Sequence, residues 1–479
     1  MPVTAVPGTP DATPAMIPTA RQRRVRTVRS RELRSVFTRL IKNKASDFFK
    51  FTRLNNEFTM KSMLTKYKSS RMENGLTIIS AESDNSDVAA LGIWIKSGYR
   101  HESSENLGFS HLLEHMLLEG TKRWPSRIEL AGQVERLGGY KNGHTDNHRM
   151  WFPIIIGRDQ TEAMIDLMSD TILNPLMDPE VLEKEKQATL EEYAGNSNDA
   201  FAFSGIKLKN KVFFQHPASY HTWNDPKNVL RATVESLDAY RQKFLVPNRS
   251  ALVVASSYSH SQIVDWAHKY FATWMENQDS IIMDKVPFSP IVKDLKYYEY
   301  RKSDQTQIIY GFANAGLSEL SQKEILSLEL IAIYLGAGSI SALIQKLRVK
   351  LGLIYGAWAG FPYQLDAGDL EIKTKTIHPV EVLRGVEEVF ENIPTAIDEK
   401  LLGDLKIQIK NTLLRNIETS NGKFNFLGDK FIDYDRLITP EEVIESMNAL
   451  TVDDIRNANR KYLTPDRRFI GIFGPKDVF

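Results

Sequence analysis

One segment of this sequence occurs twice, and this repetition restricts the fold more than any other feature. Gln242-Lys-Phe-Leu-Val-Pro-Asn-Arg249 is followed by an apolar run, and Arg460-Lys-Tyr-Leu-Thr-Pro-Asp-Arg467 is followed by another. Both patterns indicate the end of a helix, a turn with proline at the same position, and a strand. Because the surrounding order of strands and helices also repeats, we interpret the chain as an internal duplication. The interval from Gln242 to Arg460 is called the repeat offset below.

Alternating short strands and amphipathic helices are predicted from about residue 70 onward. The first half contains predicted strands at 75–80, 90–95, 150–156 and 251–255, and predicted helices at 108–119, 127–137, 161–173, 178–193 and 261–274. After a polar, proline-containing stretch at about 276–295, strands are predicted at 297–301, 307–312, 370–376 and 469–473, with helices at 323–335 and 341–350. We therefore place the two homologous domains at residues 70–285 and 286–479.

The composition excludes several kinds of chemistry. The chain has 479 residues with 61 Lys and Arg against 60 Asp and Glu, so its net charge of +1 gives no reason to expect nucleic-acid binding. It contains no cysteine, which rules out disulfides, iron–sulfur clusters and thiolate ligands. A transition metal must therefore be held by carboxylates and by some of the ten histidines. No apolar run is long enough to predict a membrane span.

The near-neutral charge hides a basic N-terminal extension, predicted to be disordered over residues 1–69. Residues 1–70 carry 15 basic and four acidic side chains, and five prolines occur by residue 18. The Arg-rich, acid-poor character is typical of a mitochondrial transit peptide, whereas the prolines disfavour an N-terminal helix. An appended extension, with Met60 or Met63 as an alternative start, explains the composition equally simply. A third interpretation is a membrane or nucleic-acid contact that is independent of the body.

The segment His111-Leu-Leu-Glu-His115 lies in the middle of a predicted helix. Residues at i and i+4 share one helical face, so both imidazoles can reach one metal ion. Glu114 lies on the same side and can act on a metal-activated water. The intervening apolar residues predict that this helix is buried, and a buried pair of histidines with a glutamate needs partners. The pattern therefore predicts a zinc site.

A catalytic zinc site needs a third protein ligand, and the acidic helix predicted over 178–193 is the natural donor. Its candidate carboxylates are those of Glu183, Glu185, Glu191 and Glu192. Glu185 and Glu192 are two helical turns apart and share a face, whereas Glu191 points about 100° away. The spacing alone leaves the choice among these carboxylates open.

The segment from Gly108 to Thr121, GFSHLLEHMLLEGT, resembles the signature of the pitrilysin/insulinase family of inverzincin metallopeptidases. The similarity extends over residues 70–479 and is greatest to the half-length branch of the mitochondrial-processing-peptidase type. It implies an α+β fold in which two homologous α/β-sandwich domains, each a mixed sheet packed by helices, form half of a clamshell. It also implies one zinc ion per chain.

The resemblance assigns roles to the residues of the predicted zinc site. His111, His115 and Glu192 are the implied zinc ligands, because the family's third ligand follows the second histidine at the interval that separates His115 from Glu192. Glu114 is the implied general base. Glu185, two helical turns before the third ligand, is the implied supporting carboxylate.

Two further motifs imply substrate contacts. Gly138-Gly-Tyr-Lys-Asn142-Gly-His-Thr145 matches a segment whose asparagine, here Asn142, helps to hold the substrate beside an edge strand. Arg348 and Tyr355 match the family's Arg/Tyr pair, which binds the substrate carbonyl. Gly143 replaces the usual alanine, and residues 146–151 are more polar and bulkier than is common. These departures affect the expected substrate preference.

Together these features predict a zinc endopeptidase that hydrolyses peptides or unfolded segments, including possible leader sequences. A shift of His111 by the repeat offset leads to Glu329, so no zinc site is expected in the second domain. The resemblance implies a homodimer, or a heterodimer with a homologous subunit, in which the Arg/Tyr pair acts in trans. The alternative is a catalytically silent scaffold or partner subunit. The expected compartment is the bacterial cytoplasm or, with a transit peptide, the mitochondrial matrix.

Overall fold

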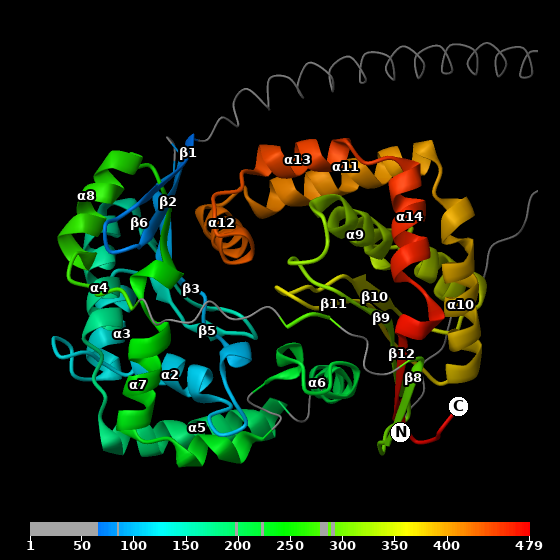
Figure 1. Ribbon diagram of the computed structural model, residues 1–479, viewed down its shortest axis with the longest axis horizontal. Helices are drawn as coiled ribbons and strands as arrows, with labels where there is room; N and C mark the ends of the chain where they lie inside the picture. The colour runs from blue at the N-terminus through cyan, green and yellow to red at the C-terminus, as the bar shows by residue number, and fades with distance from the viewer. Residues whose placement is uncertain (1–65, 84–85, 197–199, 222–224, 278–285, 289–292) are drawn as a thin grey trace, which may run out of the picture. The chain divides into compact units, whose positions relative to one another are not determined.

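The computed structural model describes residues 66–83, 86–196, 200–221, 225–277, 286–288 and 293–479 (Figure 1). Residues 66–479 form one compact unit. The basic extension lies outside the described residues up to residue 65. The first strand, β1 (Lys66–Arg71), begins before residue 70, where we predicted the start of the body. Within the described ranges, no helix is sufficiently long and apolar to cross a membrane.

The first sheet has seven strands, and its principal order is β1-β2-β7-β3-β6-β4, with β5 also paired to β6. Its strands after β1 are β2 (Thr77–Glu82), β3 (Val88–Ile95), β4 (Tyr140–Lys141), β5 (His144–Thr145), β6 (Met150–Gly157) and β7 (Ser250–Ser256). The pairing of β2 with β7 is parallel, and the other pairings are antiparallel. The sheet is therefore mixed, as predicted.

The second sheet has five strands in the order β10-β11-β9-β12-β8. These strands are β8 (Leu295–Tyr300), β9 (Thr306–Asn314), β10 (Ala357–Gly360), β11 (Gly368–Thr376) and β12 (Arg468–Gly474). Here β8 and β12 form the parallel pair, next to the antiparallel pairs β12–β9 and β9–β11. Read from β8, this order corresponds to β2-β7-β3-β6-β4 in the first sheet. The predicted fold of two homologous mixed sheets packed by helices is confirmed.

The repeat offset is preserved in the structure. Helix α7 (Val234–Phe244) recurs as α14 (Val452–Tyr462), and the boundaries of β7 and β12 differ by the same offset. Both helices begin with a threonine N-cap that accepts a hydrogen bond from the third helical residue. The turn after each helix contains a proline-initiated 3-10 segment, η6 (Pro247–Arg249) or η8 (Pro465–Arg467).

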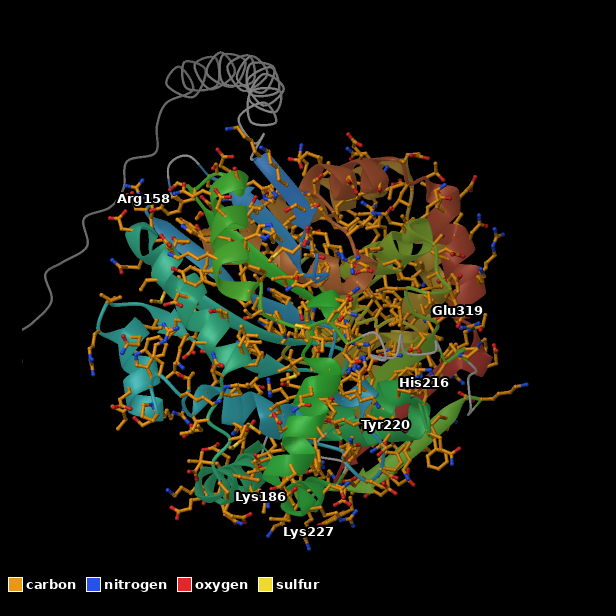
Figure 2. All side chains as sticks on the ribbon, turned by 60° about the vertical axis from the view of Figure 1, so that its left-hand side comes forward. Arg158, Lys186, His216, Tyr220, Lys227 and Glu319 are labelled. Carbon is orange, nitrogen blue, oxygen red and sulfur yellow. The ribbon has the colours of Figure 1, made fainter. Side chains whose placement is uncertain are left out.

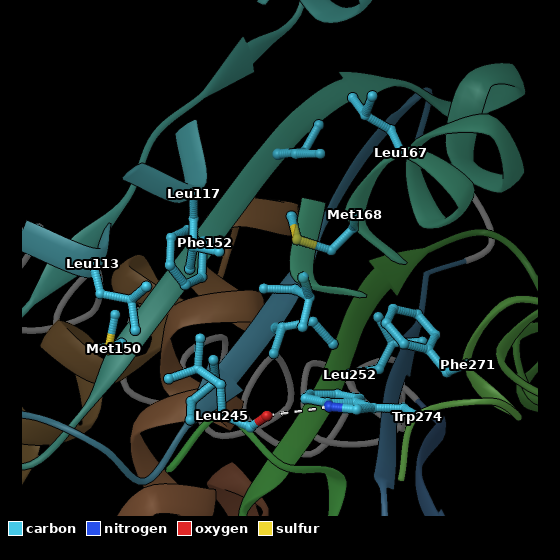
Figure 3. Close-up of a cluster of buried hydrophobic side chains, with 14 of the residues drawn as sticks. Leu113, Leu117, Met150, Phe152, Leu167, Met168, Leu245, Leu252, Phe271 and Trp274 are labelled. Atoms are coloured by element: carbon cyan, nitrogen blue, oxygen red, sulfur yellow. Dashed lines mark hydrogen bonds between the residues drawn. The ribbon is translucent and has the colours of Figure 1, made fainter. Parts of the chain in front are cut away.

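Helices cover one face of the first sheet and form its main core (Figure 3). These are α2 (Phe109–Leu118), α4 (Thr161–Leu173), α7 and α8 (His260–Phe271). Leu113 and Leu117 from α2 and Met168 from α4 pack with Phe152 of β6 in this core. The indole N–H of Trp274 donates to the Leu245 carbonyl at 3.1 Å, so this buried polar group is satisfied.

The opposite faces of the two sheets are covered by helices from the other half of the chain. Helix α12 (Ser420–Tyr434) packs on β3 and β7 (Figure 1), where Phe424 and Phe431 join the core around Trp94. A Cβ atom at Gly428 would lie 2.0 Å from the Trp94 ring, so this close approach requires glycine. Helix α6 (Ala200–Val212) in turn packs on β9 and β12. The halves are therefore interlocked through their helices.

The remaining helices are α3 (Arg127–Glu135), α5 (Pro179–Asn196), α9 (Gln322–Gly336), α10 (Pro379–Ala396), α11 (Glu399–Asn416) and α13 (Pro440–Asn448). Short 3-10 turns are η1 (Tyr99–His101), η2 (Arg158–Gln160), η3 (Pro217–Ser219) and η5 (Pro226–Arg231). The helix predicted at 341–350 is instead largely a π-helix, η7 (Ile344–Lys350). The wider turn is shown by the Leu351 N–H, which donates to the Lys346 carbonyl at 3.2 Å.

Candidate metal centre

Helix α2 presents two histidines on one face. Leu112, Leu113, Met116 and Leu117 are buried in the core, so the helix is anchored by its apolar side. The remaining face carries His111 and His115, whose ring centroids are 4.7 Å apart. The i, i+4 spacing of the sequence motif therefore brings the two imidazoles together.

Glu192 of α5 completes the group from the facing helix. Its Oε2 atom lies 3.5 Å from Nε2 of His111 and 3.8 Å from Nε2 of His115. Ligand atoms around a tetrahedral zinc ion with bonds of about 2.0–2.1 Å are about 3.3 Å apart, so both separations fit such an ion. All three ligand atoms lie within 4.8 Å of one another. Two imidazole nitrogens and one carboxylate oxygen also match the chemistry of a catalytic zinc site.

Glu185 supports this arrangement from the previous turns of α5. The helix begins with Asp178 as its cap, since Asp178 Oδ1 accepts the N–H of Glu180 at 2.7 Å. The Nδ1–H group of His115 donates to Oε2 of Glu185 at 2.8 Å, which directs Nε2 of the ring toward the group. Another candidate carboxylate, Glu183, instead pairs with Lys186, which Figure 2 labels.

Glu114 is buried beside the two histidines, with 7% of its surface exposed. The Thr145 hydroxyl donates to its Oε2 atom at 2.8 Å. Burial raises the pKa of Glu114 to about 7, although the Thr145 hydrogen bond and the charge on His115 oppose the change. A carboxylate with such a pKa is suited to general base catalysis near neutral pH.

Gly143 lies directly against Glu114. A Cβ atom at this position would be 2.8 Å from both Cγ and Oε1 of the glutamate. The glycine that departs from the family pattern therefore leaves room for the present position of the Glu114 side chain.

The two histidines have different electrostatic environments. Burial lowers the pKa of His111 to about 3, with a further lowering from the charges of His115 and His221. Burial also lowers the pKa of His115, but the hydrogen bond to Glu185 and the nearby carboxylates outweigh it and raise the pKa overall. The neutral form of His111 leaves a ring nitrogen available to coordinate a metal.

Asn142 lies between β4 and β5, at the edge of the first sheet. Its backbone N–H donates to the Pro153 carbonyl at 3.2 Å. In the next strand, β5, Thr145 pairs with Met150 of β6 and its side chain reaches Glu114. The sheet edge that carries Asn142 is thus connected directly to the metal group.

Arg348 and Tyr355 lie together in the second half of the chain. The guanidinium group is 5.0 Å from the centroid of the tyrosine ring, and Tyr355 is 83% exposed. Among the described residues, the pair forms no hydrogen bond or ion pair with His111 or His115. Exposed apolar side chains occur nearby in the sequence at Val349, Leu351 and Trp358.

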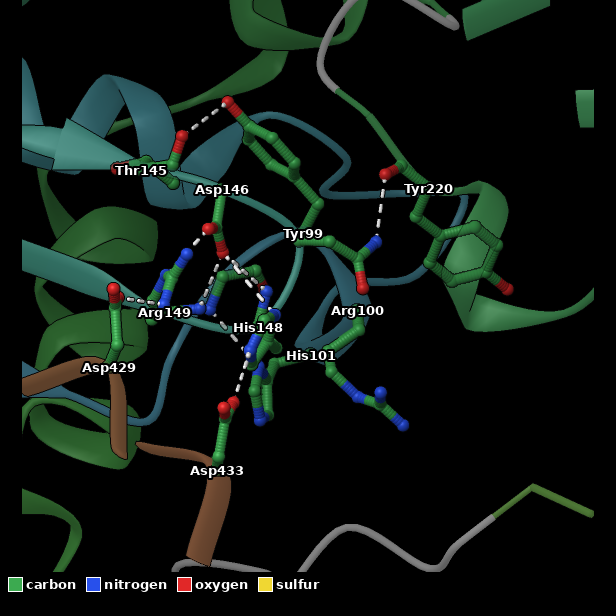
Figure 4. A network of polar contacts seen from close by, with 12 residues as sticks. Tyr99, Arg100, His101, Thr145, Asp146, His148, Arg149, Tyr220, Asp429 and Asp433 are labelled. Carbon is green, nitrogen blue, oxygen red and sulfur yellow. Dashed lines mark hydrogen bonds and ion pairs between the residues drawn. The ribbon is translucent and has the colours of Figure 1, made fainter. Parts of the chain in front are cut away.

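Several residues near the group had no role assigned from sequence. Besides Thr145, these include Tyr99 and His221, whose rings are in contact at a centroid distance of 4.8 Å. The Tyr99 hydroxyl donates to the Thr145 carbonyl at 3.4 Å (Figure 4). His221 follows Tyr220, labelled in Figure 2, and burial lowers the pKa of His221 to about 4. The signal in the sequence that could have pointed to Thr145 is its place at the end of the matched segment Gly138–Thr145.

Curated proteins with similar sequences include zinc proteases and a subunit of a mitochondrial peptidase. An uncharacterized zinc protease of Rickettsia felis is 26% identical over 87% of this chain and 99% of its own length. A second uncharacterized zinc protease, from Bacillus subtilis, is 26% identical over 82% of this chain and 95% of its own length. The mitochondrial-processing peptidase subunit beta of Dictyostelium discoideum is 23% identical over 85% of this chain and 88% of its own length.

Solved structures show the same fold. A protease from Helicobacter pylori superposes with a TM-score of 0.78 at 18% identity, covering 86% of this chain and 100% of that one. A peptidase M16 inactive domain from Pseudomonas fluorescens also gives 0.78, at 20% identity over 86% and 98% of the two chains.

Two family descriptions match successive parts of the sequence. Residues 77–224 match Insulinase (Peptidase family M16), and residues 231–409 match the Peptidase M16 inactive domain. These matches include the three residues of the metal group in the first part and Arg348 and Tyr355 in the second. The chain therefore belongs to the insulinase family of peptidases, family M16.

Proposed function

We propose that this protein is a zinc-dependent endopeptidase that hydrolyses peptides or unfolded protein segments. The observation that carries the proposal is the convergence of His111, His115 and Glu192 from two helices, with Glu114 buried at their side. Membership of a family whose relatives are named zinc proteases supports it. The complete set of ligands and base argues against the alternative of a catalytically silent scaffold.

Each residue of the group has a defined part in this chemistry. When bound, zinc acts as a Lewis acid that activates water for attack on a peptide carbonyl. Glu114 accepts the proton of this water and passes it to the leaving amine. Thr145 donates a hydrogen bond to Glu114. Glu185 fixes the tautomer and ring orientation of His115.

The open edge of the first sheet provides a place for an extended substrate. Strand β4 is the last strand on this side of the sheet, and β5 also pairs only with β6 among the described strands. A peptide that adds as a strand there gains backbone hydrogen bonds without sequence specificity. We assign Asn142 to binding the substrate backbone at this edge, beside Glu114. Binding through the backbone favours unfolded segments over folded proteins.

We assign Arg348 and Tyr355 to binding the substrate carbonyl at the metal centre of a second chain. Both side chains are exposed, and among the described residues neither forms a hydrogen bond or ion pair with His111 or His115, which supports a role in trans. One relative is named as a subunit of mitochondrial-processing peptidase, which supports pairing with an identical or homologous chain. In this assignment residues 70–285 bind zinc and residues 286–479 bind substrate. Such pairing closes the half clamshell into a chamber.

A cleavage assay combined with metal analysis tests the proposal. The purified chain, alone and with homologous subunits, is incubated with a mixture of unstructured peptides and with a folded protein, and the products are identified by mass spectrometry. The proposal predicts one zinc ion per chain, internal cleavage of the peptides and no cleavage of the folded protein. A zinc-loaded chain that cleaves no peptide in any combination would instead support the silent scaffold.

The relatives include bacterial proteins and a subunit of a mitochondrial peptidase. The bacterial cytoplasm and the mitochondrial matrix both stay predictions, and detection of the processed N-terminus in cells distinguishes them.

A further inference from the structure

The N-terminus of the metal-binding helix α2 is held by a buried carboxylate from outside the helix. Oε2 of Glu102 accepts the N–H of Gly108 at 2.6 Å, and Oε1 accepts the N–H of Ser110 at 2.6 Å. The Ser110 hydroxyl also donates to Oε1. Glu102 is 7% exposed, so these contacts are shielded from water.

This arrangement replaces the ordinary cap of a helix. The first N–H groups of a helix have no partner within it and usually bond to the side chain of the N-cap residue. The N-cap of α2 is Gly108, which has no side chain and a φ of 99°. The Glu102 carboxylate instead accepts the hydrogen bonds of these N–H groups. The positive end of the helix dipole favours the negative charge of this carboxylate.

The short segment that precedes Glu102 is fixed by backbone hydrogen bonds. Backbone N–H groups of Tyr99 and Arg100 donate to the carbonyls of Asp146 and Asn147, at 3.2 and 2.8 Å. These two carbonyls follow Thr145 directly at the end of β5. The segment therefore connects the start of α2 to the strand whose hydroxyl bonds to Glu114.

The two histidines of the metal group are supported differently. Nδ1 of His115 bonds to Glu185, as the second nitrogen of a metal-binding histidine usually bonds to an acceptor. Nδ1 of His111 is buried and, among the described residues, has no hydrogen-bond partner. The orientation of His111 thus depends on the backbone of the first helical turn. Its neighbour Ser110 donates two hydrogen bonds to Glu102, one from the backbone N–H and one from the hydroxyl.

We propose that Glu102 is a positioning residue of the metal centre, which sets the first turn of α2 and thereby the orientation of His111. This inference rests on the proposed zinc-dependent function. Burial raises the pKa of Glu102 to about 7 against the effect of its three donors. Its carboxylate is therefore predominantly ionised at pH 8, the pH chosen for the test.

The test compares full-length variants at pH 8 by two measurements. One is the zinc dissociation constant from competition with a chelator, and the other is the unfolding midpoint of the metal-free protein. Glu102→Gln keeps the size of the side chain but places an amide against three donors. We expect its zinc affinity to fall about ten-fold or more, as for other outer residues of metal sites, with a lower kcat and an unchanged KM.

Two further variants show whether a change in zinc affinity comes from the charge of Glu102. Glu102→Asp retains the charge with a shorter reach and should recover part of the affinity, whereas Glu105→Gln changes an exposed glutamate of the same loop and should bind zinc like the wild type. Wild-type zinc affinity in a folded Glu102→Gln protein overturns the inference and leaves the proposed function intact. If that variant does not fold, Ser110→Ala decides: a several-fold weaker affinity supports the inference, and an unchanged affinity overturns it. A wild-type chain without zinc overturns the proposed function and this inference with it.

Discussion

Arg100 and Asp366 form a buried, bidentate ion pair that joins the two halves of the molecule. The distances are 3.1 Å from Nη1 to Oδ1 and 2.6 Å from Nη2 to Oδ2, and the side chains are 1% and 0% exposed. Asp366 also accepts the N–H of Val286 at 3.0 Å. Arg100 lies two residues before Glu102, whereas Asp366 precedes strand β11 of the second sheet. The pair therefore fixes the segment before the metal-binding helix to the second half.

Removal of either partner of this pair should strongly destabilise the protein. Arg100→Met leaves a buried carboxylate without its counter-charge, and we expect a loss of about 3–5 kcal/mol in the free energy of unfolding. The double variant Arg100→Met, Asp366→Leu should lose less than the sum of the two single changes. Urea unfolding measures all three. As a control, Arg127→Met removes an exposed pair with Glu119 and should cost less than about 1 kcal/mol.

Zinc affinity should depend on Glu185 although this residue is not a proposed ligand. Glu185→Gln removes the charge that stabilises the bound form of His115 and should weaken zinc binding about 10–100-fold. Chelator competition measures the change. Glu183→Gln alters a neighbouring, largely exposed glutamate on the same helix and should leave the affinity unchanged. If the two variants bind zinc with equal affinity, Glu185 does not support the metal site.

Glu324 should make the stability of the second half depend on pH. Burial raises the pKa of Glu324, but hydrogen bonds from Lys461, Tyr462 and Ser321 outweigh it and lower the pKa to about 2. Because the folded pKa is below the unfolded one, this contribution is complete above about pH 4.5 and is lost as the pH falls toward 2.

Glu324→Gln tests this pH dependence. At pH 7 we expect a loss of about 1–2 kcal/mol in the free energy of unfolding, since partial exposure screens the interaction. The difference from the wild type should shrink as the pH is lowered below about 4.5. Glu445→Gln, at an exposed position on α13, should have the same free energy of unfolding as the wild type at pH 7 and at pH 3. A Glu324→Gln effect that persists unchanged at pH 3 would contradict the assignment.

Complementation between inactive variants tests whether Arg348 acts in trans. Glu114→Gln and Arg348→Met should each be inactive alone. In a mixed dimer, the intact metal centre of the Arg348→Met chain meets the intact Arg348 of the other chain. Random pairing at equal amounts should thus restore about one quarter of wild-type activity.

The control for complementation is a mixture of Glu114→Gln with Glu192→Gln. Both changes lie in the metal centre, so no mixed dimer contains an intact site and no activity should return. If mixed dimers of Glu114→Gln and Arg348→Met form but stay inactive, the pair does not act across the interface.

The sequence predicted the duplication, and with it two equivalent sheets, but it did not predict the order of the strands within them. The segments ending at Arg249 and Arg467 lead into equivalent strands because similar turn chemistry follows similar helix ends. The sequence did not predict that α6 packs on the second sheet and α12 on the first. Amphipathic periodicity shows that a helix buries one face, but it does not show which sheet receives that face. The π-helix at Ile344–Lys350 was missed for a similar reason, since residue propensities do not distinguish it from an α-helix.

The candidate site was predictable where its residues share a helix. The i, i+4 spacing of His111 and His115 and the two-turn spacing of Glu185 and Glu192 follow from helical geometry. The choice of Glu192 over the other carboxylates needed the family resemblance. Glu102 and Thr145 bond to α2 from a loop and a short edge strand, and such long-range contacts leave no periodic signal in a sequence.

The central claim, a zinc-dependent peptide hydrolysis with Glu114 as the base, is tested most directly by Glu114→Gln. Zinc content and the rate of cleavage of a quenched unstructured peptide are measured for the wild type and the variant at the same pH. We expect one zinc ion per chain in both proteins, and in the variant a rate lower by about 10²–10⁴-fold or more. A zinc-loaded Glu114→Gln protein that cleaves the peptide at the wild-type rate would contradict the account.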